Sequence, residues 1–438
     1  MSQDTRAGYW PSFRAGDFVR YVLIPLTFIV VLPILTILLW LIVRYFDGSV
    51  LTFAEEASLD RVIQLWPLPS VKAAAMLGAW ITLQALLLLA LPGRRQLGPV
   101  TPAGDRVAYK LNGVPAFLVT VTAFCVASST KWFSPTVVYD HFGEILMTCS
   151  LTGILGSFLL YFKGVWAPST RDAGSTGRVV WDYYWGMELH PRILGIDLKQ
   201  LGICRLAMMG WVVILLSCAA KQTAVYGHLS SSMAVSVGLQ LLYIFKFFWW
   251  EGGYFNTLDI MHYRLGFRNF WGVMAWLPAV YPLVALFLVH HPRDLSLSTA
   301  VLIVALGVAA IWANYDADAQ RHRVRATAGH SNVWGRPPAI LRATYQTSGG
   351  VQQEALLLMS GWWGLARHFH YVSEIVLAVS WTMPAGFDYI APWFYVGYLG
   401  ILLVHRAGYD DRRCQEKYGH VWKAYCERVR YRVIPFVY

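Results

Sequence analysis

A short polar segment that directly follows an apolar stretch carries side chains able to donate a proton. The segment, residues 247–262, reads FFWWEGGYFNTLDIMH and holds one glutamate, one tyrosine, one aspartate and one histidine. Ionisable groups at membrane depth are costly, so they tend to be functional or paired inside the protein. We predict Tyr254 or Glu251 as the donor, with Asp259 and His262 as hydrogen-bonded support. The sequence fits equally well with Glu251 and Asp259 pairing with arginines or capping helices.

Three basic segments rich in aromatic residues occupy the last third of the chain. Residues 316–325 (DADAQRHRVR) continue from an apolar run, which predicts a helix leaving the membrane with Arg321 and Arg325 on one face. Residues 360–371 (SGWWGLARHFHY) place tryptophans beside an arginine and two histidines. Residues 406–432 hold eight Lys or Arg against four Asp or Glu. Guanidinium forks and aromatic faces suit a phosphate-bearing cofactor, whereas lipid headgroup contact is the simpler alternative.

Signatures of soluble cofactor domains and of metal sites are missing from the sequence. It has no GxGxxG, no GxxxxGK[ST], no HExxH and no group of closely spaced histidines. A nicotinamide cofactor would therefore be held by side chains and not by a Rossmann domain. The six cysteines are scattered without a CxxC pair, so neither a disulfide framework nor a zinc site is expected.

The elements that must position these residues are membrane helices. The chain of 438 residues is 56% hydrophobic and only 14% charged, which leaves too little polar surface for a soluble globule of this size. A helix needs roughly 20 apolar residues to cross a bilayer. We predict an all-α, polytopic integral membrane protein with about ten transmembrane helices. The expected segments are Tyr21–Val43, Ala73–Gly93, Leu111–Thr130, Ile145–Phe162, Leu206–Ala220, Leu229–Phe245, Asn269–Val289, Leu295–Tyr315, Ile375–Phe387 and Tyr389–Val404.

The chain reads as a single integral membrane domain, 1–438, with a polar N-terminal tail at 1–20. Loops are short before Phe162, and the long polar stretches follow it, so the predicted catalytic half is 206–438. The positive-inside tendency places the basic C-terminal tail in the cytoplasm. The expected membrane is the endoplasmic reticulum in a eukaryote or the inner membrane in a bacterium, and membrane lipids are the expected surroundings. No nucleic acid partner is expected.

Two long motifs carry a family resemblance. The tail HRAGYDDRRCQEKYGHVWKAYCERVRYRVIPFVY, residues 405–438, and the segment SGWWGLARHFHY both resemble signatures of the sterol reductase family. The resemblance runs from about Pro99 to the C-terminus. Within the family, the chain is most similar to the branch that reduces 7-dehydrocholesterol-type 5,7-diene sterols, through VTPAG, WFSPT, GMELHPRI, AAKQ, LVHHPRDLS and VWGRPP.

The resemblance implies a ten-helix fold whose C-terminal half binds NADPH in a pocket open to the cytoplasm, with a sterol substrate entering from the bilayer. NADPH carries a 2′-phosphate and a pyrophosphate, which require several cationic forks. By matching positions, the cofactor contacts would be Arg321, Arg325, Trp363, Arg367, His368, Tyr371, Arg406, Asp410, Arg413, Lys417 and Tyr418. The chain departs from the family pattern at Asp318, which adds a carboxylate near the expected phosphates.

The implied reaction is reduction of a sterol ring double bond by protonation and hydride transfer, most simply at the Δ7 position. An isolated alkene is not electrophilic, so a buried acid must protonate it before or during hydride delivery. Reduction of a Δ14 or Δ24 double bond is an alternative reaction, and it would use the same fold and cofactor. A sterol-binding membrane protein without catalysis is the alternative from another class. A transporter is disfavoured because the polar residues gather in loops and in the last third.

Overall fold

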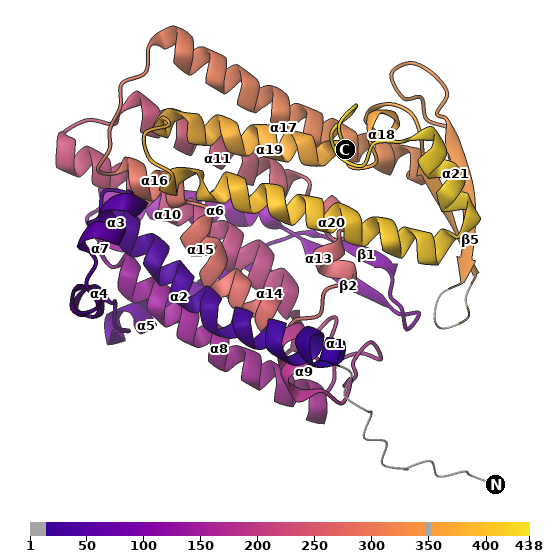
Figure 1. Ribbon diagram of the computed structural model, residues 1–438, viewed down its shortest axis with the longest axis horizontal. Helices are drawn as coiled ribbons and strands as arrows, with labels where there is room; N and C mark the ends of the chain where they lie inside the picture. Colours follow the sequence, from indigo (N-terminus) through magenta and orange to yellow (C-terminus); the bar gives the residue numbers. More distant parts are fainter. Residues whose placement is uncertain (1–14, 347–349, 351) are drawn as a thin grey trace.

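The computed structural model describes residues 15–346, 350 and 352–438, and it is mostly helical (Figure 1). Seven helices in this part of the chain are long and apolar enough to cross a membrane. This supports a multi-pass integral membrane protein. The seven are Gly16–Tyr45, Val71–Ala90 (α5), Phe142–Trp166 (α8), Gln200–Tyr226, Ser231–Trp249 (α11), Phe267–Leu288 and Leu297–Ala326 (α17). The first joins α1 (Ala15–Phe18), a π-helical turn (Val19–Leu23) and α2 (Ile24–Tyr45), and the fourth joins a π-helix (Gln200–Ala207) and α10 (Met208–Tyr226). The sixth joins α14 (Phe267–Trp271), a π-helical turn (Gly272–Trp276), α15 (Leu277–Val280) and α16 (Leu283–Leu288).

The other three predicted segments are also helical but fall short of a long apolar span. They are α6 (Gly113–Ser129), α19 (Phe369–Thr382) and α20 (Phe394–Tyr418). α19 and α20 contact each other and lie side by side, as expected of a helical hairpin (Figure 1). Two 3₁₀ turns, Met383–Ala385 and Ala391–Trp393, lie in the link between them. The last two turns of α20 are polar, so this helix leaves the apolar layer before it ends.

One helix is much longer than the sequence indicated. The fifth predicted segment began at Leu206 because Arg205 interrupts the apolar run, yet the helix begins at Gln200. The charge is tolerated because the Arg205 guanidinium is fully buried against the Glu251 carboxylate. The predicted extension of the eighth segment past residue 315 is confirmed, since α17 runs without a break to Ala326.

The all-α prediction was too narrow, because three antiparallel hairpins lie in the polar stretches. They pair β1 (Arg94–Val100) with β2 (Arg106–Leu111), β3 (Arg192–Ile193) with β4 (Ile196–Asp197), and β5 (Ile340–Gln346) with β6 (Gln352–Leu358). Each hairpin satisfies the backbone polar groups of a loop locally. The hairpins β1–β2 and β5–β6 gather at one end of the bundle together with α13 and α21 (Figure 1).

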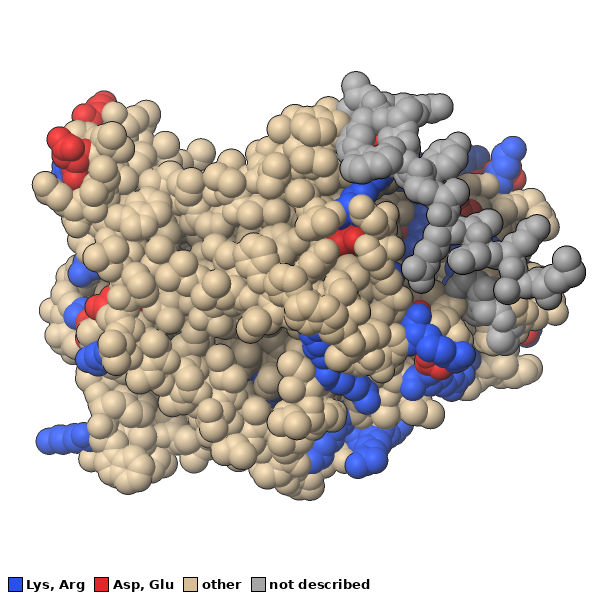
Figure 2. All heavy atoms as spheres, turned by 90° about the horizontal axis from the view of Figure 1, so that it is seen from below, with Lys and Arg blue, Asp and Glu red and all other residues tan. Residues whose placement is uncertain are grey.

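Short helices cover the two ends of the bundle. They are α3 (Val50–Glu56), α4 (Leu59–Leu65), α7 (Val137–Asp140), α9 (Val179–Trp185), α12 (Glu251–Tyr254), α13 (Leu258–Met261), α18 (Trp362–Leu365) and α21 (His420–Arg428). On the face shown in Figure 2, charged side chains gather toward the two ends and a broad uncharged band separates most of them. A band of this kind fits the hydrocarbon layer of a bilayer.

Candidate active site

One face of α20 carries most of the predicted cofactor residues of the tail. Arg406, Asp410, Arg413 and Lys417 follow one another at steps of four, three and four, so they share a helix face. The C-terminal part of α20 contacts β5, and the two lie at one end of the bundle (Figure 1). The fold therefore supports a common site for these four side chains.

Four cations form what we call the cation cluster: Arg321 and Arg325 on α17, and Arg413 and Lys417 on α20. Arg321 is paired with Asp318 at 3.1 Å, and Arg413 is paired with Asp410 at 3.0 Å. Within the part of the chain that the structure describes, Arg325 and Lys417 have no acidic partner. Burial, followed by repulsion from Arg413, lowers the pKa of Lys417 to about 8. Two of the four cations of the cluster are therefore not ion-paired with any carboxylate among the described residues.

Aromatic side chains line this cluster. Arg321 lies 4.2 Å from the ring centre of the buried Trp363, whose indole N–H donates to the Ala317 carbonyl at 2.7 Å. The Lys417 ammonium lies 3.7 Å from the ring centre of Tyr345 on β5. Tyr418 meets the same Tyr345 ring edge-on at 5.7 Å. Flat faces beside these cations suit a ligand that has both phosphates and rings.

The turn that carries Asp259 and His262 meets α20 directly. Arg406 donates to the Asp259 carboxylate at 2.5 Å, and Arg413 is hydrogen bonded to His262 Nε2. Burial, and then the Arg413 guanidinium, lower the pKa of His262 to about 3, so this imidazole is neutral near pH 7. Asp259 and His262 were predicted to hydrogen bond to the proton donor. Among the described residues they are instead bonded to two predicted cofactor residues, across 147 and 151 positions of sequence, and not to Tyr254 or Glu251.

The two predicted proton donors stand in different surroundings. Glu251 is buried, ion-paired with Arg205 at 2.7 Å, and accepts the backbone N–H of Gly113 at 2.9 Å. This is the paired, helix-capping alternative that the sequence left open. Tyr254 is half-buried, and its hydroxyl has no hydrogen-bond partner among the described residues. Burial, then the nearby Asp259 carboxylate, raise the pKa of Tyr254 well above 10, so it keeps its proton.

Two residues of the SGWWGLARHFHY segment hold the tail in place. Arg367 is buried and donates to the backbone carbonyls of Val429 and Arg430 at 2.8 and 3.1 Å. His368 lies 3.8 Å from the Asp410 carboxylate, and burial lowers the pKa of this imidazole to about 4. Its ring stacks on Tyr371 with centres 5.0 Å apart. These side chains shape the wall of the site, and the guanidinium of Arg367 is already used within the protein.

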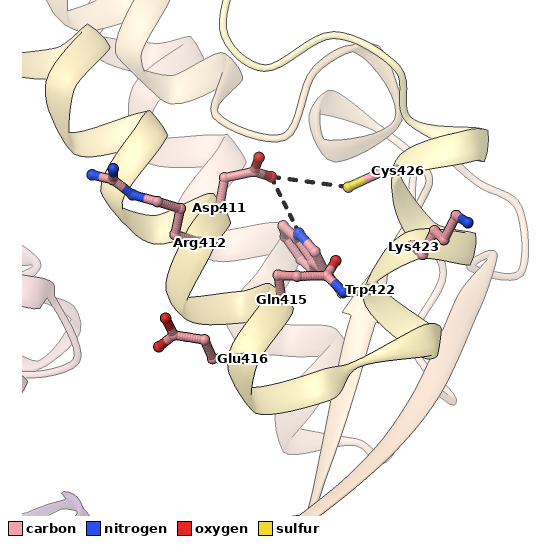
Figure 3. A pocket seen from close by; sticks show the side chains of 7 residues that line it. All are labelled: Asp411, Arg412, Gln415, Glu416, Trp422, Lys423 and Cys426. Carbon is pink, nitrogen blue, oxygen red and sulfur yellow. Dashed lines mark hydrogen bonds between the residues drawn. The ribbon is translucent and has the colours of Figure 1, made fainter.

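Two residues that contribute to the candidate site, Asp411 and Tyr345, were not predicted from the sequence. Asp411 accepts from the Trp422 indole at 3.1 Å and is ion-paired with Arg432 at 3.0 Å, so it fastens α21 and the final residues to α20 (Figure 3). The DD pair in the tail motif was a signal for Asp411. Tyr345 lies on a strand that was not predicted, and no signal in the sequence pointed to it.

A cavity of about 350 Å³ lies elsewhere on α20. It opens between α20 and α21 (Figure 3). Its lining carries cations and carboxylates together, and it contains no member of the cation cluster. We therefore place the candidate site at the cation cluster. The lining residues are Asp411, Arg412, Gln415, Glu416, Trp422, Lys423 and Cys426.

The fold and the site together define a class: a multi-pass integral membrane protein that gathers cations and aromatic rings at one end of its helix bundle. Residues 20–438 match the model of the Ergosterol biosynthesis ERG4/ERG24 family, and the chain belongs to that family of sterol reductases. The resemblance read from the tail motifs is thereby confirmed. Sterol reductases of this family use a reduced nicotinamide cofactor and act on a sterol.

Named relatives cover nearly the whole chain. It is 45% identical over 410 residues to a protein of Arabidopsis thaliana named 7-dehydrocholesterol reductase, which covers 93% of this chain and 95% of the relative. It is 35% identical over 413 residues to the Delta(14)-sterol reductase of Methylotuvimicrobium alcaliphilum, with 94% of each chain covered. The 7-dehydrocholesterol reductase of Xenopus laevis is 34% identical over 397 residues, with 87% and 84% covered.

Proposed function

We propose that this protein uses NADPH to reduce the Δ7 double bond of a 5,7-diene sterol. The observation that carries the proposal is the cation cluster, in which Arg325 and Lys417 have no acidic partner among the described residues. The Arabidopsis relative, 45% identical and named 7-dehydrocholesterol reductase, supports the Δ7 bond. The more distant Delta(14)-sterol reductase, at 35% identity, supports Δ14 as the second candidate.

The residues present fit the cofactor. A 2′-phosphate and a pyrophosphate bring several negative charges, and the two cations without acidic partners, together with Arg321 and Arg413, can receive them. Trp363 and Tyr345 offer flat faces at the same place. When bound, NADPH supplies the hydride. The ion pair of Arg406 with Asp259 fixes the turn that leads from the cation cluster toward Tyr254.

Tyr254 is the proton donor in this proposal. Its hydroxyl keeps its proton near pH 7, and it has no partner within the described chain that would occupy it. Glu251 is less suited, because its carboxylate already compensates the buried Arg205 charge. Asp259 and His262 act as supports through Arg406 and Arg413, and the sterol is expected to reach this region from the bilayer.

The experiment that tests the function is a reduction assay on detergent-purified protein. Incubated with NADPH and a 5,7-diene sterol, the protein should remove the conjugated-diene absorbance and yield a product two mass units heavier. An 8,14-diene sterol serves as the comparison substrate. Reduction of that sterol alone would move the activity to Δ14. Cofactor binding without turnover of either sterol would overturn the proposed reaction and favour a sterol-binding protein.

Loss of the Lys417 ammonium should weaken NADPH binding strongly. A hydrogen bond to a charged group contributes about 1.5–3 kcal/mol, so Lys417→Ala should raise Kd by roughly 10- to 150-fold. Lys423→Ala is the matched control, because Lys423 is an exposed lysine on α21 that lines the other cavity and does not belong to the cation cluster. Fluorescence titration with NADPH measures both variants. Equal affinities for the two variants would remove Lys417 from the site.

The same lysine predicts a pH dependence. Its ammonium, with a pKa of about 8, is protonated below that pH, and only the protonated form attracts phosphate. The Kd for NADPH should therefore rise as pH increases through about 8. Lys417→Arg keeps the charge at alkaline pH and should lose most of this rise. A rise of the same size in Lys417→Arg would assign the titration to another group.

A further inference from the structure

A buried lysine lies behind the turn that meets α20. Lys199 is fully buried, and its ammonium donates to the backbone carbonyls of Asp259 at 3.0 Å and Ile260 at 2.7 Å. These carbonyls belong to α13 (Leu258–Met261), a helix of four residues. The last carbonyls of any helix lack partners within the helix. Lys199 therefore supplies hydrogen bonds that α13 cannot make for itself.

Lys199 is itself held by a buried polar layer from the N-terminal half. The Asp197 carboxylate accepts the backbone N–H groups of Lys199 at 3.0 Å and Gln200 at 2.9 Å, which fixes the start of the helix that follows. His190, from the GMELHPRI motif, is buried beside this layer and is hydrogen bonded to the Tyr109 hydroxyl at 3.2 Å. None of these residues was assigned a role from the sequence.

The backbone next to α13 is tied to the same motif. Leu265 donates its N–H to the carbonyl of Glu188 at 3.0 Å. Gly186 and Gly266 pack so closely that a Cβ on either would overlap the backbone of the other. The GMELHPRI segment thus holds the end of the turn 258–266, while Lys199 holds its middle.

An uncharged side chain could be buried at the position of Lys199 at a lower free-energy cost than an ammonium. Burial lowers the pKa of Lys199 to about 7, with the Asp197 and Asp259 carboxylates opposing the shift. Burying an ammonium is costly unless its N–H groups are used, and here two are used on α13. The hydrogen bonds that the Lys199 ammonium donates to the turn bearing Asp259 and His262 offset this cost. We therefore take the positioning of that turn as the role of Lys199.

We propose that Lys199 is a positioning residue for the cofactor site: it fixes α13 so that Asp259 meets Arg406 and His262 meets Arg413. The inference rests on the proposed function in taking these arginines as part of the NADPH site. It gives the GMELHPRI segment and the residues that follow it a role in cofactor binding, although they lie before the predicted catalytic half. Without the ammonium, two carbonyls lose their donors and α13 is free to rotate.

The test is a double-mutant cycle on the full-length protein in detergent. Lys199→Met should raise the Kd for NADPH about tenfold or more. In an Asp259→Asn background the same substitution should change the Kd clearly less, because one of the two contacts through which Lys199 acts is already weakened. Lys110→Met is the matched control, since the Lys110 ammonium also donates to a backbone carbonyl, that of Leu89 at 2.7 Å, and this carbonyl is not part of α13. Equal effects of Lys199→Met in both backgrounds would overturn the proposal.

A second readout needs no cofactor. Hydrogen exchange at the amides of Met261, His262 and Tyr263 should become at least tenfold faster in Lys199→Met and stay unchanged in Lys110→Met, since these amides close the α13 turn. Unchanged exchange in Lys199→Met would also overturn the proposal. If Lys199→Met does not fold, Lys199→Gln replaces it in both measurements, because it removes the charge and its shorter side chain holds the amide N–H groups farther from the α13 carbonyls. Failure of the unsubstituted protein to bind NADPH would count against the proposed function, and hydrogen exchange would still decide the role of Lys199.

Discussion

Tyr254→Phe is expected to lower kcat for sterol reduction by roughly 100- to 10,000-fold, the range that a positioned proton donor contributes. The substitution removes only the hydroxyl. The ring packs against Phe247 and Phe255, with centres 4.9 and 6.3 Å away, and phenylalanine keeps these contacts. The Kd for NADPH and the thermal stability should therefore stay close to those of the unsubstituted protein. Single-turnover reduction of the diene, followed by its absorbance, measures the effect.

A matched tyrosine separates chemistry from packing. Tyr183 is buried, and its hydroxyl donates to the Ile154 carbonyl at 3.2 Å in the N-terminal half. Tyr183→Phe should leave kcat within about twofold, because it removes a hydroxyl far from the candidate site. If Tyr254→Phe retains more than a third of kcat, the proton comes from another group, and Tyr254 is only part of the packing.

The second large effect is expected on stability and comes from the buried ion pair of Arg205 with Glu251. Both side chains are almost completely excluded from solvent and lie 2.7 Å apart. The Asn112 side-chain oxygen accepts from Arg205 at 2.8 Å, and Gly113 donates its N–H to Glu251 at 2.9 Å. Removing one partner leaves the other charge buried and uncompensated, which costs about 3–5 kcal/mol. Arg205→Met should therefore lower Tm markedly and reduce the yield of folded protein.

The exposed pair of Arg342 with Glu354 is the matched control, at a similar separation of 2.8 Å. An exposed pair contributes about 0–1 kcal/mol, so Arg342→Met should barely move Tm. The double variant Arg205→Met, Glu251→Leu should recover part of the loss, since no buried charge remains. Thermal melts at one fixed scan rate compare all four proteins. Equal shifts for the buried and the exposed pair would show that Glu251 is not held as an ion and would return it to the list of proton donors.

The membrane helices could be predicted because hydropathy is a property of a short window. Each of the ten predicted segments overlaps a helix, and the fifth was predicted to begin too late, at Leu206, because of Arg205. A window of sequence reports that charge as a break, because it cannot include the Glu251 carboxylate that compensates it. The hairpins β1–β2 and β5–β6 were missed for a related reason. Their strands are short and half-exposed, so they lack the apolar alternation that marks a buried strand.

The cation cluster could be predicted in part. Spacings of three and four residues put Arg406, Asp410, Arg413 and Lys417 on one face of a helix, and the family motifs pointed to the same residues. Which cations have no acidic partner could not be read from the sequence. Arg367, like Arg325, is an arginine in one of the three basic segments of the last third of the chain. Its guanidinium, however, donates to two backbone carbonyls of the tail and is not free to bind a phosphate.

The sequence by itself determined that this chain crosses a membrane several times, that it belongs among the sterol reductases, and which residues carry its charge. These properties depend on local windows and on motifs, where the information lies within a few turns of helix. Only the tertiary structure decided which charges meet. Asp259 reaches Arg406 across 147 residues, and Lys199 reaches α13 across about 60. Contacts at such separations form only when the helices pack, because burial of the partners, and not their spacing, selects the pairs.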